Sequence, residues 1–500
     1  MNRVPFRSGV FVALSLPLIV YLLTMPPSLT WAHYGADGGD LVTAVARGSI
    51  PHPPGFPTYL LLGELFIRLP WGDPAWRLNL MSAVLAAGAA GLTAAAVSLF
   101  PCFGISQEAG GRKQEAGGRK QEADKSAIRH SPFAIRHSPS AICAGLSLGL
   151  APLFWSQALI AEVYAPAAFF AALVAVLALR GGPAWALGLA WGVGMGAHPT
   201  ILFMAPLVIW GGWDVALPPM GGTEGGLRRL AQTVLLALLG WGAMYGPVLL
   251  ARGGVPSPWG DVSTLGGWWA LVSGRMYHGY LFALPLAAWP QRLLAWAGLL
   301  ARQFTPFGAL LAGLGWLRLW RERRALAGAS VLVFGAFSLY AVGYNTTDSL
   351  VYLALALPLA ALWLGVGLAQ AAGWLEKRLR HGAWLLLLLP LLQALLFWGQ
   401  MDLSGDRAAM DWAERVLEEA PPQAVLLTAQ DAHTFTLWYV HGVLNERPDV
   451  VVVDRDLWGQ ESYRRMMAGA LGLADATAGL SPEEAARQVG RPVVKVTNDE

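Results

Sequence analysis

The chain has 500 residues, of which 55% are hydrophobic and only 13% are charged. A soluble protein of this length needs roughly a quarter of its residues charged, so soluble multidomain, disordered and coiled-coil proteins are excluded. The net charge of +3 indicates little, and two cysteines cannot form the framework of a secreted disulfide scaffold. The composition predicts a polytopic α-helical membrane protein.

Eleven stretches have the apolar character of a membrane-spanning helix, which needs about 20 residues. They are Val10–Met25, Leu78–Phe100, Ile142–Ile160, Tyr164–Leu179, Trp185–Ala197, Ile201–Trp213, Leu230–Leu250, Phe304–Trp320, Leu326–Val342, Ser349–Ala369 and Ala383–Trp398. The two stretches beside His198 and Pro199 are short, and Pro199 is expected to break any continuous helix there. The apolar stretch Leu281–Leu300 contains two prolines and Arg292, so we interpret it as an interfacial segment.

Basic residues near the ends of these stretches predict their orientation. With Arg3 and Arg7 in the cytoplasm, alternation places all compact basic clusters there: the 101–140 loop, Arg180, Arg228-Arg229, Arg321–Arg324, and Lys377 with Arg378 and Arg380. The opposite side receives Asp37, Asp40, Glu64, Asp73, Glu162, Asp261 and Asp348. The N-terminus is therefore expected in the cytoplasm and the C-terminus outside. Only five of the 35 basic residues are lysine, a skew that favours a GC-rich bacterial source and hence a bacterial plasma membrane.

Two segments allow a second interpretation. Val10–Met25 could be a cleaved signal peptide, but its apolar run exceeds the usual signal core, so an uncleaved first helix is preferred. The 101–140 loop contains the tandem repeat QEAGGRK-QEAGGRK. Such a basic repeat could bind nucleic acid or anionic lipid. Its glycines and mixed charges favour a low-complexity cytoplasmic insertion instead, and no nucleic-acid partner is expected.

Residues 401–500 have a different composition and predict a small extracytoplasmic α/β domain. Residues 406–420 predict an amphipathic helix, AVLLT (424–428) a strand, Asp431–Gly442 a helix, and DVVVVD (449–454) a buried strand. Strand, helix and strand within thirty residues are typical of a βαβ unit. A further strand is expected at PVVKV (492–496), shortly before the chain ends, which leaves open whether this domain is complete.

The first extracytoplasmic loop, residues 28–77, holds two carboxylates directly beyond the first span. Asp37 and Asp40 lie three residues apart, and a stiff HPPGFP segment beginning at His52 follows. Asp40 has an alternative role as the N-cap of a short helix over Leu41–Ala46. HPPGFP has an alternative role as a rigid turn.

Further polar residues gather on the same predicted side of the membrane: Glu162, His198, Asp261, Arg275, Tyr277, Tyr344, Asp348 and Tyr352. Glu162 has an alternative role as a helix end, His198 as a packing histidine, and Asp348 as the N-cap of the tenth span. Taken together, these residues predict one polar crater at the outer leaflet.

Several ordered motifs carry a family resemblance. They are DGGDLVTAVARGSIPHPPGFPTYLLLGELF with RLNLMSAV, FWSQALIAEVYAP, PWGD with RMYHGYLF, YNTTDSLVYL, and QDAHTFTLWYVHGVLNERPDVVVVD. Over residues 10–465, apart from the 101–140 insertion, the chain resembles the family called domain of unknown function 2723, whose animal members are the transmembrane protein 260-like O-mannosyltransferases. The loop of that family reads closer to GGDSGEL, so Asp37 matches its aspartate and Asp40 replaces its glutamate.

The resemblance implies a GT-C glycosyltransferase: residues 1–400 form a transmembrane domain that uses a polyprenyl-phosphate hexose, mannose-like, at the extracytoplasmic face. The acceptor hydroxyl of a protein, glycan or lipid must lose a proton during attack, so a carboxylate, Asp37 or Asp40, is needed as general base. The lipid phosphate that leaves needs cationic or hydrogen-bonding donors. The candidates are His52, Arg77, His198 and Arg275, and Glu162, Asp261, Tyr277 and Asp348 are expected to bind donor or acceptor.

No cofactor is expected, because the sequence has no P-loop or dinucleotide-binding glycine fingerprint, and no His/Cys cluster has the spacing of a metal site. Two other function classes stay open. A lipid or glycan transporter would place ionisable residues near the middle of the membrane, often in repeated halves, whereas these spans are nearly free of charge. A non-catalytic membrane scaffold is the third possibility.

Overall fold

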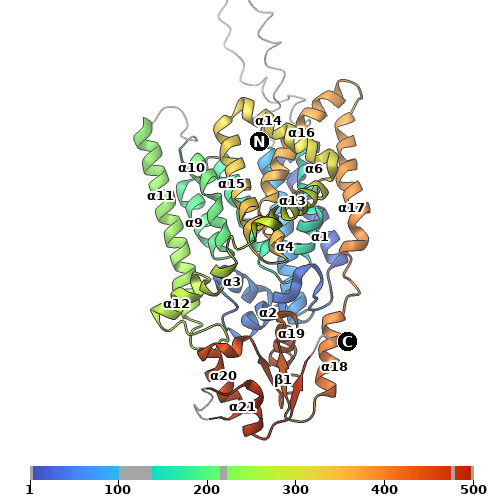
Figure 1. Ribbon diagram of the computed structural model, residues 1–500. Coiled ribbons are helices and arrows are strands. Elements are labelled where there is room, and N and C mark those ends of the chain that lie inside the picture. The colour runs from blue at the N-terminus through green and yellow to red at the C-terminus, as the bar shows by residue number, and fades with distance from the viewer. Residues whose placement is uncertain (1–3, 101–137, 214–221, 474–478, 497–500) are drawn as a thin grey trace, which may run out of the picture.

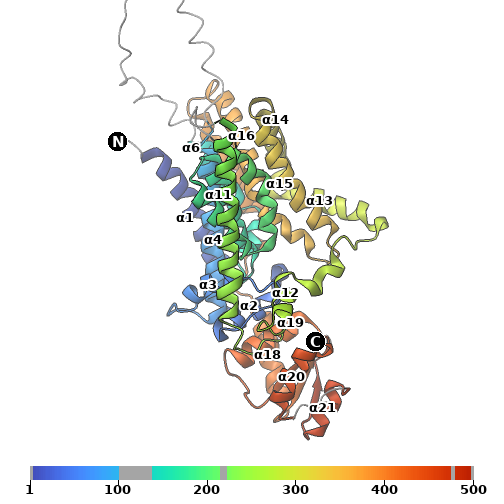
Figure 2. The ribbon, with the colours of Figure 1, turned by 90° about the vertical axis from the view of Figure 1, so that its left-hand side faces the viewer.

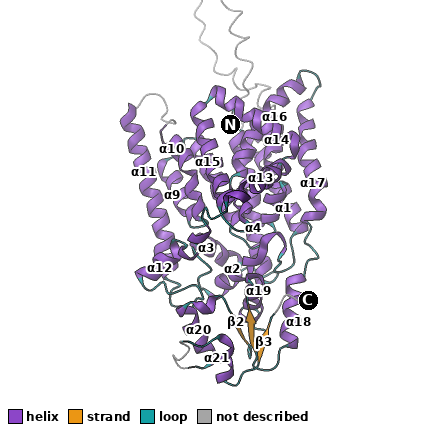
Figure 3. Cartoon of the chain, viewed as in Figure 1, coloured by secondary structure: helices purple, strands orange, loops and turns teal. Residues whose placement is uncertain are grey.

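The computed structural model describes residues 4–100, 138–213, 222–473 and 479–496. The helices stand side by side in one bundle, and the strands are confined to one end of the molecule (Figures 1 and 3). The bundle contains α1 (Val4–Thr24), α4 (Pro74–Val97), α6 (Ser138–Gly149), α7 (Pro152–Ala158), α8 (Tyr164–Leu179), α9 (Ala184–Met195), α10 (Ala205–Trp213), α11 (Gly222–Ala243), α14 (Thr305–Glu322), α15 (Arg324–Gly343), α16 (Leu357–Glu376) and α17 (Leu388–Met401).

Shorter elements join or cap these helices. They are the 3₁₀ helices η1 (Ala32–Asp37), η3 (Pro199–Met204), η5 (Arg275–Tyr280), η6 (Leu286–Ala288), η7 (Ser349–Leu355) and η8 (Gly382–Leu387), the π-helical turn η4 (Met244–Val248), and the α-helices α2 (Gly38–Arg47), α3 (Pro57–Phe66), α12 (Leu265–Val272) and α13 (Trp289–Gln303). The first predicted loop, 28–77, therefore contains η1, α2 and α3.

Five helical stretches of the described residues are long and apolar enough to cross a membrane: Pro74–Val97, Gly225–Val248, Arg324–Gly343, Leu357–Glu376 and Gly382–Met401. A sixth is the pair Pro139–Gly149 and Pro152–Ala158, which is bent by 64°. Pro152 explains the bend, because its ring cannot continue the hydrogen bonds of the preceding helix.

Four shorter apolar helices accompany them: Ser8–Thr24, Tyr164–Leu179, Ala184–Met195 and Pro199–Gly212. All eleven stretches predicted from the sequence thus contain helix, and the break expected at Pro199 lies between α9 and η3. How many of the eleven cross a membrane stays a prediction. The 101–140 insertion lies outside the described residues, except for 138–140, which begin α6.

The stretch interpreted as interfacial contains η6 and most of α13, and Figure 2 shows this part of the chain projecting from the side of the bundle. Leu286 and Leu294 are largely exposed there. Exposed leucines beside a membrane fit the interfacial interpretation, which stays a prediction.

The C-terminal unit consists of α18 (Ala408–Glu419), β1 (Val425–Thr428), α19 (Asp431–Gly442), β2 (Val451–Asp454), η9 (Leu457–Gly459), α20 (Glu461–Leu471), α21 (Pro482–Gln488) and β3 (Val493–Lys495). The strands form a parallel sheet in the order β2-β1-β3, with Val425 paired to Val451 and to Val493. The three predicted strands are all present, and α19 has the predicted bounds. Parallel pairing explains the apolar runs of β1 and β2, because both faces of such a sheet are covered.

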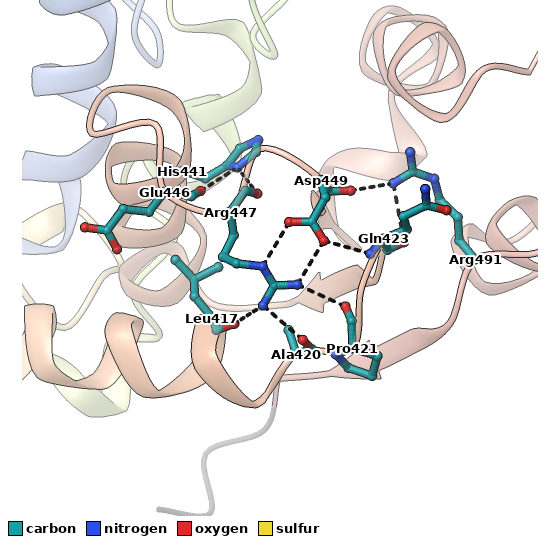
Figure 4. Close-up of polar contacts among 9 residues, drawn as sticks. All are labelled: Leu417, Ala420, Pro421, Gln423, His441, Glu446, Arg447, Asp449 and Arg491. Carbon is teal, nitrogen blue, oxygen red and sulfur yellow. Dashed lines mark hydrogen bonds and ion pairs between the residues drawn. The ribbon is translucent and has the colours of Figure 1, made fainter.

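Arg447 ties the loops of this unit together (Figure 4). Its guanidinium donates two hydrogen bonds of 2.9 Å to Asp449 and others to the carbonyls of Leu417, Ala420 and Pro421. The end of α18 is therefore fixed to the start of β2.

The C-terminal unit packs directly on the first loop through α19, which contacts α2 and η1. The indole N–H of Trp31 donates to the hydroxyl of Thr436 at 2.9 Å. A Cβ at Gly39 would lie 2.2 Å from the carbonyl oxygen of Phe435, so only glycine allows α2 and α19 to approach this closely. The beginning of α1 and the C-terminal unit lie at opposite ends of the molecule (Figures 1 and 2).

Candidate active site

A cavity of about 600 Å³ lies where the bundle meets the C-terminal unit. Its lining residues come from seven segments of the chain, within residues 34–37, 52–56, 162–164, 198–200, 272–281, 340–352 and 431–435. Six of the residues predicted for the site line it: Asp37, His52, Glu162, His198, Tyr277 and Asp348. Breaks between apolar helices bring them together, since each lies at or near a helix end on the same side.

Asp37 and Asp40 flank the imidazole of His52. Nδ1 of His52 lies 2.8 Å from Oδ2 of Asp40, and Nε2 lies 3.6 Å from Oδ2 of Asp37. The side chain of Asp37 is 39% exposed, whereas those of Asp40 and His52 are 4% and 11% exposed. Asp37 therefore presents its carboxylate to the cavity, and Asp40 lies behind the histidine.

The N-cap alternative for Asp40 is not what the structure shows. Asp40 lies inside α2, and the N-cap position belongs to Asp37, whose side chain makes no capping hydrogen bond. Oδ2 of Asp40 also accepts from the backbone N–H of His52 at 2.8 Å, and Oδ1 accepts from the indole of Trp259 at 3.0 Å. Both oxygens of Asp40 are thus used to hold His52 and Trp259.

The HPPGFP segment forms a turn, which was the alternative interpretation of its sequence. The same turn places His52 in the cavity wall. The N–H of Gly55 donates to the carbonyl of His52 at 2.9 Å, and the φ of Gly55 is +86°, which favours glycine. The rings of Phe56 and Trp259 pack edge-on against the imidazole at 5.1 and 5.9 Å. The turn therefore fixes both the position and the ring orientation of His52.

Burial and neighbouring charges shift the pKa values of both Asp37 and His52. Burial raises the pKa of the Asp37 carboxyl; His52 lowers it, Asp40 and Asp348 raise it, and the net direction is upward. Burial lowers the pKa of His52, but Asp37, the hydrogen bond to Asp40 and Glu162 outweigh it and raise the value to about 9. At neutral pH His52 is a cation held between two carboxylates.

Glu162 and His198 also line the cavity. Burial and then Asp37 raise the pKa of Glu162 well above its ordinary value, which favours the protonated acid. Burial and the His52 cation lower the pKa of His198 to about 3, so His198 is neutral. Its Nδ1 lies 2.7 Å from the Thr200 hydroxyl, and its ring stacks on Phe56 at 5.9 Å.

Four predicted residues do not line the cavity: Asp40, which lies behind His52, and Arg77, Asp261 and Arg275. Arg77 donates to the carbonyls of Ile67, Trp71 and Gly72, and thereby fixes the turn before α4. Asp261 accepts from the N–H of Ser263 at 2.8 Å in an exposed loop. Arg275 is exposed and absent from the lining, although Gly274 and Tyr277 beside it are part of it.

The basic side chains among the described lining residues are all histidines: His52, His198 and His278. Tyrosine is the most frequent of the other polar residues in the wall. Tyr344 and Tyr352 were expected in the crater; Tyr34, Tyr164, Tyr280 and Tyr340 were missed. Tyr164 and Tyr340 lie within predicted apolar spans, where a hydroxyl at a helix end gives almost no sequence signal.

The C-terminal unit also contributes Asp431 and Phe435 to the cavity lining, which the sequence did not predict. The QDAHTF motif that contains them was recognised only as part of the family resemblance. Among the described residues, no group of three or more His, Cys, Asp or Glu side chains could hold a metal ion.

Comparison with known proteins identifies a related family and a similar fold. Residues 37–212 match the family described as the Protein O-mannosyl-transferase TMEM260 N-terminal domain. A curated relative, Protein O-mannosyl-transferase TMEM260 of Mus musculus, is 40% identical over 96 residues, which are 18% of this chain and 13% of the relative. The matched region is thus a small part of that relative's length.

Two crystal structures of ArnT from Cupriavidus metallidurans have a similar fold. The structure bound to undecaprenyl phosphate is 13% identical, with a TM-score of 0.55, over 90% of this chain and 91% of ArnT. The apo structure is 12% identical, also with a TM-score of 0.55, over 90% of each chain. The resemblance predicted from the sequence is therefore confirmed for residues 37–212, which match the TMEM260 N-terminal domain family, and the chain as a whole has a fold similar to that of ArnT.

Proposed function

We propose that this protein is a membrane glycosyltransferase that transfers a hexose from a polyprenyl-phosphate donor to a hydroxyl acceptor. The observation that carries the proposal is a cavity-facing carboxylate, Asp37, beside a histidine that Asp40 holds in place. The TMEM260 relative is named as a protein O-mannosyl-transferase, and ArnT was crystallised with undecaprenyl phosphate. These names support mannose as the sugar and a polyprenyl phosphate as the carrier.

Asp37 is the general base. As the acceptor oxygen bonds to the anomeric carbon of the sugar, its proton passes to the Asp37 carboxylate, and the bond from that carbon to the phosphate oxygen breaks. Burial supports this role, because a raised pKa makes the carboxylate a stronger base near neutral pH. Asp40 is a positioning residue, since both of its oxygens are already bonded to protein groups.

The leaving polyprenyl phosphate takes the electron pair and gains negative charge. His52 is the cation nearest to Asp37 in the wall, and neutral His198 and the tyrosine hydroxyls are hydrogen-bond donors. A water-poor cavity strengthens such interactions. This assignment replaces Arg77 and Arg275, which do not line the cavity, with histidine and tyrosine.

The reaction takes place on the extracytoplasmic side of the membrane. The cavity lies where the bundle meets the C-terminal unit, and that unit is at the end of the molecule opposite to the start of α1 (Figures 1 and 2). This arrangement supports extracytoplasmic chemistry with the N-terminus in the cytoplasm of a bacterial cell. The acceptor is a protein hydroxyl or a glycan or lipid hydroxyl. The residues assigned to the reaction need no cofactor and no metal, because proton transfer and charge stabilisation are supplied by side chains.

The test is to incubate membranes containing this protein with radiolabelled polyprenyl-phosphate hexoses and to identify the labelled product. A glycosylated acceptor that depends on the protein supports a glycosyltransferase. Label that crosses the bilayer still attached to its lipid would indicate a transporter. A protein that neither moves nor consumes the donor would be a scaffold, and both outcomes contradict the proposal.

A further inference from the structure

Asp431 is a second cavity carboxylate, and it comes from the C-terminal unit. It is the first residue of α19, three residues after the end of β1, and its side chain is exposed into the cavity that Asp37 also lines. Parallel α/β sheets bind ligands beyond the carboxyl ends of their strands. The carboxyl end of β1 therefore faces the candidate active site.

The carboxylate of Asp431 is unused within the protein. In the described ranges, neither a hydrogen bond nor an ion pair joins it to another side chain or to the backbone. Burial, and then Asp37 and Asp454, raise its pKa to about 6. An acid in the first turn of a helix also stabilises that helix, but this role does not require a place in the cavity wall.

The position of Asp431 relative to Asp37 is fixed by close packing. Gly39, two residues after Asp37, leaves room for the backbone of Phe435, which is one turn beyond Asp431 on α19. Trp259 donates to Asp40 and packs against Phe435 with ring centroids 5.9 Å apart. The contacts of Gly39 and Trp259 therefore fix α19 next to the residues that surround Asp37.

The directions from which the two substrates arrive favour the acceptor, and not the donor, as the partner of Asp431. A polyprenyl-phosphate donor is held by its chain in the membrane, so it reaches the cavity from the side of the bundle. The C-terminal unit covers the other side (Figures 1 and 3). A hydrophilic acceptor, which no chain holds in the membrane, meets the part of the cavity wall that α19 supplies through Asp431 and Phe435.

We propose that Asp431 binds the acceptor, accepting a hydrogen bond from an O–H or N–H group next to the hydroxyl that reacts. This inference rests on the proposed glycosyltransferase function and adds the acceptor side of the same site. Asp431 orients the acceptor so that its reacting hydroxyl lies at Asp37, and takes no proton itself.

The test uses the purified full chain in lipid nanodiscs. Undecaprenyl-phosphate [¹⁴C]mannose is the donor, and a Ser/Thr-rich peptide and methyl α-mannoside are the acceptor probes. Asp431→Asn is compared with Glu418→Gln, which removes one charge from exposed α18, outside the cavity lining. The KM of each substrate is measured at a saturating concentration of the other.

Replacing the carboxylate with a neutral amide weakens a charge-assisted hydrogen bond, so Asp431→Asn should raise the acceptor KM by roughly tenfold. The donor KM should stay within about twofold, because the donor contacts are untouched. Asp431→Glu should recover part of the loss, and Glu418→Gln should resemble wild type. A purely structural role would lower the melting temperature and leave the acceptor KM unchanged.

Two results would overturn the inference alone: an active wild type whose Asp431→Asn variant keeps its acceptor KM, or a variant whose donor KM rises instead. A wild type that forms no product from either probe contradicts the proposed function itself, and this inference with it.

Discussion

The cavity and the loops of the C-terminal unit each place an aspartate beside a basic side chain, with opposite consequences. Asp449 receives two hydrogen bonds from Arg447 and one from the N–H of Gln423, so its oxygens are fully used (Figure 4). Asp37 has His52 at 3.6 Å, beyond hydrogen-bond distance, and no capping hydrogen bond. The first arrangement fixes a loop, and the second leaves a carboxylate free to accept a proton.

The pKa values follow the same division. The hydrogen bonds from Arg447 hold the pKa of Asp449 well below its ordinary value, so Asp449 stays ionised and is a poor base. Burial moves the pKa of Asp37 in the other direction. A carboxylate therefore becomes a candidate base when it is buried with its lone pairs unused, whereas a bidentate arginine removes that capacity.

The largest expected effect comes from the same substitution at both aspartates. Asp37→Asn should lower turnover by about a hundredfold or more, because the proton acceptor is lost while the shape is kept. Asp449→Asn should leave turnover unchanged and lower the melting temperature, since it weakens the contact with Arg447. Steady-state transfer assays and thermal unfolding of both variants test these expectations. Equal losses of turnover in the two variants would contradict the assignment of Asp37 as a base and Asp449 as a structural residue.

Asp40→Asn should have a smaller effect, roughly a tenfold loss of turnover, because it removes a charge-assisted hydrogen bond that positions His52. It should also change the pH profile. The wild-type rate should fall at low pH as Asp37 takes up a proton, and fall again as the pH rises through about 9, where His52 loses its charge.

Asp40 raises the pKa of both His52 and Asp37, so its removal should move the alkaline limb and the acid limb of the profile to lower pH. The measurement is the pH dependence of kcat for wild type and Asp40→Asn. An alkaline limb that does not move would mean that His52 does not set it.

The smallest of these effects is expected at Gly39. An added methyl group would meet the backbone of Phe435, so Gly39→Ala should push α19 away from α2 and raise the acceptor KM by about threefold. Gly399→Ala is the matched control, because a Cβ there meets nothing within 4 Å. If both variants bind the acceptor like wild type, close contact between α2 and α19 is not needed for the site.

Much of this architecture could be predicted from the sequence. Apolar length predicts the helices, and prolines such as Pro152 and Pro199 predict where they break. Because each break lies near the same predicted side, residues as distant as Asp37, His198 and Asp348 could be expected together. The three strands of the C-terminal unit follow from short apolar runs with turn residues between them.

The rest depends on contacts that no local pattern encodes. Asp40 looks like an N-cap from its position, and only the turn after α2 brings His52 to its carboxylate. Arg275 looks like a phosphate ligand from its charge, but the cavity is lined by its neighbours instead. Asp431 lies almost 400 residues from Asp37, and only the packing of α19 on α2 places both in one cavity.

The central claim is that the Asp37 carboxylate accepts the acceptor's proton, and chemical rescue tests it most directly. Asp37→Ala leaves a gap beside His52 in a cavity of about 600 Å³, large enough for a small carboxylate such as formate. Transfer from undecaprenyl-phosphate [¹⁴C]mannose should be nearly absent in this variant, return in part as formate is added, and be unaffected by formate in wild type. An Asp37→Ala protein that transfers the sugar at the wild-type rate without formate would contradict the account.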